Sequence, residues 1–203
     1  MKITIIVEGE TEKVFIPHLR RFLESRLEGN MPKLDPYPYD GRIPTKEKLK
    51  RVVEKLLAAG PRASDAVIAL TDVYTGTREF TDAADAIDQM KKWVGANEKF
   101  YAHAAQYDFE AWLLAYWTDI QKLAGSNRTL LSPVPENVNH DKPPAYHLRE
   151  VFRTGKHKKC YVKTRDANRI LRGKDLSVSA NKCPQLKAFL NTILSLCGGQ
   201  PVE

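Results

Sequence analysis

The chain has 203 residues, of which 42% are hydrophobic and 28% are charged. This length fits one domain with a small appendage. The composition excludes disordered and fibrous proteins, and no apolar run is long enough to span a membrane. Three cysteines without CxxC spacing predict neither a disulfide framework nor a zinc site. Because the first strand follows Met1 directly, we expect no signal peptide, no membrane partner and a cytoplasmic location.

The net charge of +7 is concentrated in one part of the chain. Residues 140–175 contain eleven lysines and arginines against four acids, whereas the remainder balances with 21 of each. A concentrated basic segment favours a polyanionic partner, most often DNA or RNA. The alternative is a solvated surface with scattered lysines.

Strands and helices are predicted to alternate through the first 125 residues. Short apolar runs predict strands at 2–7, 33–39, 66–72 and 100–105. Helical spacing of apolar residues predicts helices at 12–27, 45–57, 82–94 and from 108 onward. Pro36 and Pro38 favour an edge position for the second strand, and the uniform apolarity of 66–70 favours a central one for the third. Thr45 and Asp108 are candidate N-cap residues.

This alternation predicts an α/β fold with right-handed crossovers and a mainly parallel, four-stranded sheet flanked by helices. Beyond Gly125 the pattern loosens, and short helices are predicted at 146–152, 164–171 and 184–196. We therefore expect an α/β core at 1–125 and a basic, mostly helical extension at 126–203 that packs on the core.

Three carboxylates stand where predicted strands end. Glu8 follows the first strand, Asp72 ends the third and Glu110 follows the fourth. The carboxyl ends of parallel strands share one edge of a sheet, where ligands of open α/β sheets gather. Glu10 and Glu12 add like charge near Glu8, which a divalent cation would offset because such ions prefer oxygen ligands. The alternative is that Glu10 and Glu12 complement the dipole of the next helix.

These strand ends lie in segments that resemble Toprim domains. The segments are Val7–Glu12, Leu70–Gly76 and Tyr107–Leu114, and Cys183-Pro184 before an amphipathic helix adds to the likeness. More narrowly, the chain resembles a bacterial family of small stand-alone Toprim-like proteins related to overcoming-lysogenization nucleases.

The resemblance implies a Rossmann-like sheet and a Mg²⁺ or Mn²⁺ site that acts on phosphodiesters. By motif position, Glu8 matches the Toprim glutamate and Asp72 the first acid of the Asp-x-Asp pair. Glu12 matches the second acid of the Val-Glu-Gly-x-Thr-Glu motif. Glu110 matches a glutamate that follows the fourth strand in the stand-alone relatives.

One position departs from this pattern. Tyr74 stands where Asp-x-Asp has its second acid, and a phenol cannot replace a carboxylate as ligand of a hard cation. Either one metal site is weakened, or Glu79 or Asp82 substitutes from the loop, or catalysis is lost.

The basic segment supplies candidate nucleic-acid contacts. These are Lys156, His157, Lys158, Lys159, Lys163 and Arg165. Lys163 is also a candidate catalytic residue that contacts the scissile phosphate, against the simpler interpretation of a surface charge. His18 and His103 are predicted to be structural.

The sequence therefore predicts a Mg²⁺- or Mn²⁺-dependent nuclease. By analogy with the family, it would serve as effector of an antiviral defence system with an ATPase partner, and it would assemble as a homo-oligomer. No GxxxxGK[ST] phosphate loop is present, so the ATPase would be a separate chain. Two alternatives stay open: a catalytically silent nucleic-acid-binding or regulatory module, and a nucleotide-handling phosphotransfer enzyme.

Overall fold

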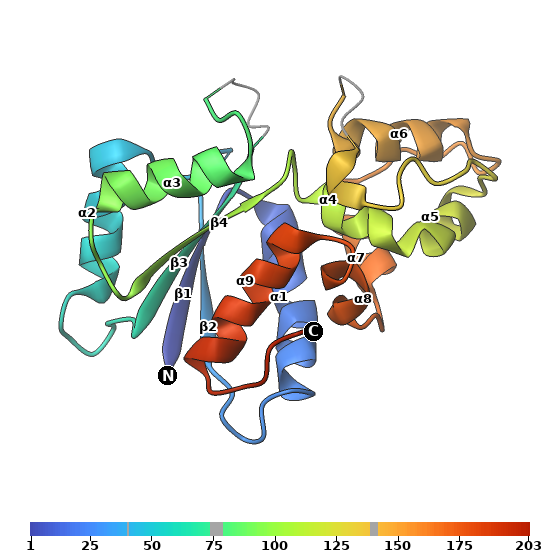
Figure 1. Cartoon of the computed structure of the whole chain (residues 1–203). Helices are drawn as coiled ribbons and strands as arrows, with labels where there is room; N and C mark the ends of the chain where they lie inside the picture. Colours follow the sequence, from blue (N-terminus) through green and yellow to red (C-terminus); the bar gives the residue numbers. More distant parts are fainter. Residues whose placement is uncertain (40, 74–78, 139–141) are drawn as a thin grey trace.

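The computed structural model describes residues 1–39, 41–73, 79–138 and 142–203 of the chain (Figure 1). Its strands are β1 (Lys2–Val7), β2 (Lys33–Pro38), β3 (Ala66–Asp72) and β4 (Phe100–Ala105). They form one sheet in the order β2-β1-β3-β4, and every neighbouring pair is parallel. The predicted α/β class, the parallel sheet, the edge position of β2 and the central position of β3 are thus confirmed.

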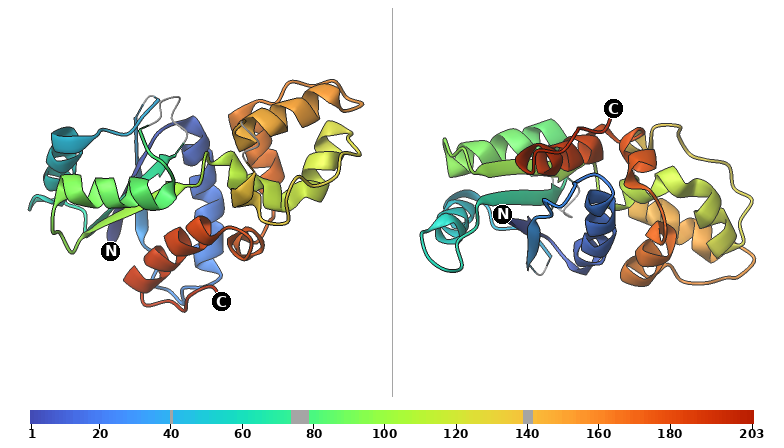
Figure 2. Two further views of the ribbon diagram at one scale, coloured as in Figure 1. Left: turned by 45° about the horizontal axis from the view of Figure 1, so that its top comes forward. Right: turned by 90° about the horizontal axis from the view of Figure 1, so that it is seen from below.

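The sheet is buried on both faces, which explains the uniform apolarity of its central strands. On one face, Ile3, Ile5 and Ile68 pack in a cluster with helices α1 (Glu10–Glu24) and α9 (Pro184–Leu196). On the other face, residues such as Ile6 and Val67 pack against α2 (Lys46–Leu57) and α3 (Ala83–Val94). Alternate residues of one strand therefore serve two different helix layers (Figure 2).

A group of short helices lies beside the sheet (Figure 1). Its members are α4 (Glu110–Leu113), η1 (Leu114–Tyr116), α5 (Trp117–Ala124), η2 (Pro135–Asn137), α6 (Pro144–Thr154), α7 (Lys163–Leu171) and α8 (Leu176–Ala180). Helix α7 packs against α1, and α9 then returns to the sheet beside β4. One buried cluster runs from the sheet face into these helices. The domain boundary at residue 125 stays a prediction.

Several local predictions need correction. The pattern that starts at Asp108 forms two helices, α4 and α5, with a 3₁₀ turn between them, and α8 was not predicted. Thr45 is the N-cap residue of α2, as predicted, although its side chain makes no cap hydrogen bond. Asp108 does not cap α4, whose N-cap residue is Phe109. Within the described residues, no helix combines the length and the apolarity needed to cross a bilayer.

Candidate active site

Glu8 is held against the end of β3. It follows β1 directly and is 7% exposed. The parallel register pairs Ile6 with Ala69, which brings Glu8 beside Thr71 two residues further along. The Glu8 Oε1 atom accepts hydrogen bonds from the Thr71 hydroxyl and, at 3.1 Å, from the backbone N–H of Asp72. The ends of β1 and β3 are therefore joined through the Glu8 carboxylate, as the topology of a parallel sheet allows.

Glu110 is fully buried in the first turn of α4 and faces two residues from the basic segment. The Lys163 Nζ atom lies 3.2 Å from Glu110 Oε1 and 3.3 Å from Oε2. The Tyr161 hydroxyl donates a hydrogen bond to Glu110 Oε1 at 3.4 Å. The N-terminus of α7 thus brings a cation to the carboxylate that follows β4.

Asp108 also belongs to this site, although the sequence predicted only a capping role for it. Its Oδ2 atom accepts a hydrogen bond from the backbone N–H of Ala145 at 3.0 Å. Its Oδ1 atom is buried and has no hydrogen-bond partner among the described residues. Burial, reinforced by the negative charge of Glu110, raises the pKa of Asp108 to about 8. The spacing Asp108-Phe109-Glu110 at a strand end was the signal that could have identified it.

The Lys163 ammonium connects these acids. Burial of the ammonium group favours its neutral form, but the carboxylates of Glu110, Asp72 and Asp108 outweigh this effect and raise the pKa of Lys163. Lys163 is therefore a stable cation among three acids that come from β3 and the segment after β4. We call Glu8, Asp72, Asp108, Glu110 and Lys163 the carboxylate centre.

The structure brings together Glu8, Asp72, Glu110 and Lys163 of the predicted site. The backbone of Glu12 lies in the first turns of α1. The side chains of Glu10 and Glu12, and the whole of Tyr74, lie outside what the structure describes. The role of Glu12 stays a prediction.

The donor atoms of the carboxylate centre are of the kind that a hard divalent cation prefers. Its donors are carboxylate oxygens, which Mg²⁺ and Mn²⁺ prefer, and Asp108 Oδ1 is a buried oxygen without a partner in the described structure. In the described part of the chain, no three acidic, histidine or cysteine residues lie close enough to enclose an ion. A metal site here would therefore need a rearrangement of these side chains or a ligand from the undescribed ones.

The acids that were expected to replace the missing second acid have other partners. Glu79 forms an ion pair with Arg42. The Asp82 carboxylate caps α3 by accepting the N–H of Asp85 at 2.8 Å. The structure thus gives both acids a structural role outside the carboxylate centre.

The four basic residues Lys156, His157, Lys158 and Lys159 form an exposed loop between α6 and α7, which we call the basic loop. Among the described residues, no ion pair involves these lysines. Arg165 differs, because its guanidinium is paired with the buried carboxylate of Asp166 at 2.7 Å. His157 shows no acidic or cysteine neighbours that would complete a metal site in the described structure.

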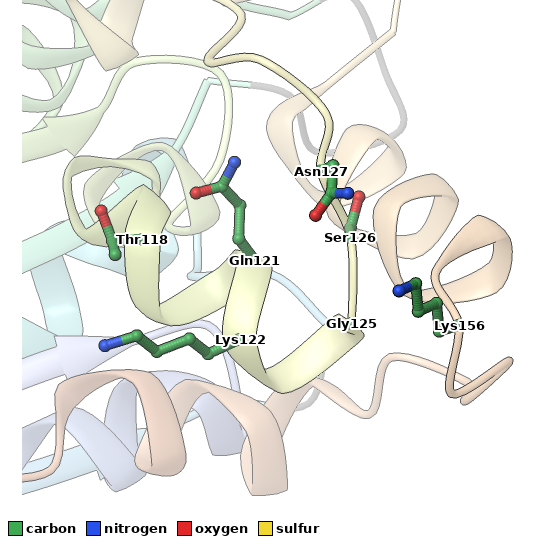
Figure 3. A pocket seen from close by; sticks show the side chains of 7 residues that line it. All are labelled: Thr118, Gln121, Lys122, Gly125, Ser126, Asn127 and Lys156. Carbon is green, nitrogen blue, oxygen red and sulfur yellow. The ribbon is translucent and has the colours of Figure 1, made fainter.

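A hollow of about 380 Å³ lies where the basic loop meets the end of α5 (Figure 3). It is lined by Thr118, Gln121, Lys122, Gly125, Ser126, Asn127 and Lys156. No acidic residue lines it, and the Lys156 N–H is hydrogen-bonded to the Gly125 carbonyl at 2.9 Å. The basic loop is thereby fixed against α5, with a surface of lysines, hydroxyls and amides.

A single family model covers both the carboxylate centre and the basic loop. The family model "Domain of unknown function (DUF4276)" matches residues 7–194. The chain belongs to the DUF4276 family. The DUF4276 match includes the carboxylate centre and the basic loop, so both lie within the family's domain. No curated protein sequence matches this chain.

Two solved structures resemble this DUF4276 chain. One is the C-terminal region of the Burkholderia pseudomallei OLD protein, at 13% identity and a TM-score of 0.54, covering 96% of this chain and 98% of that one. Another is the C-terminal region of the Xanthomonas campestris pv. campestris OLD protein, at 16% identity and a TM-score of 0.48, covering 97% and 96%. The first likeness shows a shared fold, and the predicted Toprim-like fold is confirmed.

Proposed function

We propose that this DUF4276 protein is a Mg²⁺- or Mn²⁺-dependent nuclease that hydrolyses nucleic-acid phosphodiesters. The observation that carries the proposal is that Glu8 and Asp72 meet at one edge of a parallel sheet, where the Lys163 ammonium pairs with Glu110 and also interacts with Asp72. Clustered acids can hold a divalent ion, and a basic surface can hold a polyanion. A nuclease needs both.

The acids that the sequence predicted each have a role in this scheme. Asp72 would be the principal metal ligand, with Glu8, Glu110 and Glu12 completing the set. A divalent ion held there would lower the pKa of a bound water and stabilise charge on the phosphate. The Glu8 carboxylate is positioned by Thr71 and by the Asp72 N–H, and it acts as general acid/base. Lys163 offers its ammonium to the scissile phosphate.

The substrate class follows from the charge distribution. The lysines of the basic loop, with His157, Lys163, Arg165 and the hollow of Figure 3, would contact phosphates of DNA or RNA. The remaining parts of the proposal rest on family context: a separate ATPase partner, a homo-oligomeric assembly and a role in defence against phage.

The proposal is tested by a cleavage assay on single- and double-stranded DNA and RNA, including tRNA, with Mg²⁺ and then Mn²⁺. Glu8→Gln and Asp72→Asn should each lower the rate by roughly 10²–10⁴-fold, as expected when an acid/base or a metal ligand is removed. Glu54→Gln, an exposed acid on α2, serves as the matched control. Full activity of Glu8→Gln or Asp72→Asn excludes the scheme.

The second candidate is a catalytically silent nucleic-acid-binding module. Two observations favour it: Tyr74 replaces an acid in the sequence, and Glu110 is already neutralised by Lys163. Salt-sensitive binding of nucleic acid without cleavage under every metal condition would support this module over the nuclease.

A further inference from the structure

Two tyrosines at the end of β2 extend the row of side chains at the carboxyl edge of the sheet. The Tyr39 N–H donates to the Val7 carbonyl at 2.8 Å, so Tyr39 lies opposite Glu8 just beyond the paired strands. The Gly41 N–H then donates to the Glu8 carbonyl at 3.2 Å. Tyr37, two residues before Tyr39, points to the same face. The backbone that carries both rings is therefore fixed beside Glu8.

The two rings form a supported pair. Their centroids are 5.7 Å apart and their planes are tilted by 52°. Tyr39 is half-buried and packs against the apolar cluster under α2, which includes Ile43 and Leu49. Tyr37 is the outer ring and is 37% exposed. Because the inner ring supports the outer one, Tyr37 loses little side-chain freedom when a flat ligand covers it.

The strand order places this aromatic pair and Lys163 on either side of the acids. In the order β2-β1-β3-β4, the carboxyl edge passes from Tyr39 to Glu8 and then to Asp72. It ends at the segment after β4, where Lys163 Nζ lies 3.2 Å from Glu110. Three strand spacings of ~4.8 Å give this edge a width of about 14 Å. An aromatic ring for a base and a cation for a phosphate are the two groups that recognise a nucleotide chain.

A base can stack on a protein side chain only when its face is free. In a duplex each internal base is covered by its neighbours, whereas a base of a single strand can stack on an aromatic ring in almost any sequence. We infer that Tyr37, backed by Tyr39, stacks on a base of a single-stranded nucleic acid whose backbone crosses the carboxyl edge towards Lys163. This inference rests on the nucleic-acid binding in the proposed function, and it names the form of substrate that the site takes.

The test is the affinity of the full chain for a fluorescein-labelled oligothymidylate, measured by anisotropy in EDTA so that no cleavage occurs. Tyr37→Leu should weaken binding at least ~5-fold, the loss expected for one base–aromatic stack, whereas Tyr37→Phe keeps the ring and should stay within ~2-fold. The slope of log affinity against log salt should not change, because stacking releases no counterions. Tyr101→Leu, at a half-buried tyrosine near the start of β4, is the matched control and should bind as the wild type does.

A strand without bases makes the test specific for stacking. An abasic oligonucleotide of the same length keeps every phosphate but offers no ring to Tyr37. The wild type should bind it at least ~5-fold less tightly than the oligothymidylate, and Tyr37→Leu should bind it as the wild type does. The first of these comparisons needs no variant, and circular dichroism verifies that Tyr37→Leu is folded.

The outcomes separate this inference from the proposed function. Equal affinity of the wild type and a folded Tyr37→Leu for the oligothymidylate, or the same loss on the abasic strand, would overturn the inference and leave the nuclease standing. A loss confined to the strand with bases, in a protein that cleaves under no metal condition, would support the inference and overturn the nuclease. No binding of any nucleic acid by the wild type would overturn both.

Discussion

At the scale of single residues, Asp108 is held where its neutral form is favoured. Its carboxyl group is buried beside Glu110, and one of its oxygens has no partner among the described residues. Burial, and after it the negative charge of Glu110, opposes ionisation and raises the pKa of Asp108 to about 8.

This pKa predicts how stability depends on pH in the absence of metal. An acid with a higher pKa in the folded than in the unfolded chain stabilises the fold only while protonated. The free energy of unfolding should therefore fall as the pH rises between about 4 and 8. Asp108→Asn should flatten this decline, and Asp88→Asn, at an exposed position on α3, should not. Urea unfolding at a series of pH values in EDTA measures both, and identical slopes for Asp108→Asn and the wild type would contradict the assignment.

Asp166 shows the opposite case, a buried acid that is fully paired. Its carboxylate accepts hydrogen bonds from the Val162 N–H at 2.8 Å and from the Arg165 guanidinium at 2.7 Å and 2.9 Å. Burial alone would raise its pKa, but the hydrogen bonds from Arg165 and Val162 outweigh it and lower the pKa. Asp166 therefore stabilises the start of α7, the helix that carries Lys163.

We expect Asp166→Ala to lower the free energy of unfolding by about 1–3 kcal/mol, since the Val162 N–H loses its acceptor. Asp88→Ala, which removes an exposed acid, should change it by less than about 0.5 kcal/mol. Chemical denaturation at pH 7 measures the difference. Equal stability of the two variants would show that Asp166 does not hold α7.

At the scale of elements, two helices receive their caps from distant parts of the chain. Helix α6 begins with Pro144, and its Ala145 N–H is bound by Asp108 from the end of β4. Helix α9 begins with Pro184, and its Gln185 N–H is bound by Glu136 at 3.1 Å and 3.2 Å. A sequence pattern reveals only local caps, as at Thr45, because capping across 37 or 49 residues depends on packing.

The loop that carries the basic residues is fixed by a close approach at Gly155. A Cβ atom at this position would lie 2.0 Å from the Ala124 carbonyl oxygen, at the end of α5. Because that oxygen belongs to the backbone, it cannot move as a side chain would. The packing of the basic loop on α5 therefore requires glycine here.

Gly155→Ala should destabilise the protein by roughly 1–3 kcal/mol through overpacking. It should also weaken nucleic-acid binding, because the Lys156 N–H to Gly125 bond is displaced. Gly29→Ala is the comparison: its Cβ would meet open space, so only the strain of a positive φ remains. Thermal unfolding measures the stability, and fluorescence anisotropy measures the binding of nucleic acid. Unchanged binding by Gly155→Ala would show that the basic loop is not part of the nucleic-acid surface.

At the scale of the whole molecule, the charge excess lies in the segment that closes over the carboxylate centre. Residues 140–175 carry the net +7 of the chain, and they contain both the exposed lysine loop and the paired Lys163. The paired cation acts within the centre, whereas the loop lysines are available to a polyanion.

Replacing Lys156, Lys158 and Lys159 by glutamine should weaken binding to duplex DNA. The slope of log affinity against log salt should fall by roughly 0.9 for each lysine that contacts a phosphate. The same change at Lys48, Arg51 and Lys55, exposed on α2, should leave the slope unchanged. Anisotropy titrations over roughly 50–200 mM salt compare the two triple variants. Equal slopes would place the nucleic-acid surface elsewhere.

The sequence by itself determined the order of strands and helices, the parallel sheet and the sheet edge at which Glu8, Asp72 and Glu110 gather. It could do so because burial on both faces of a parallel sheet imposes continuous apolar runs, and parallel strands all end on one side. Only the tertiary structure decided which groups meet there: Lys163 against Glu110, Asp108 against α6, and Glu79 paired with Arg42. These contacts join residues far apart in sequence, so they follow from how α4, α6 and α7 pack, which no local pattern specifies.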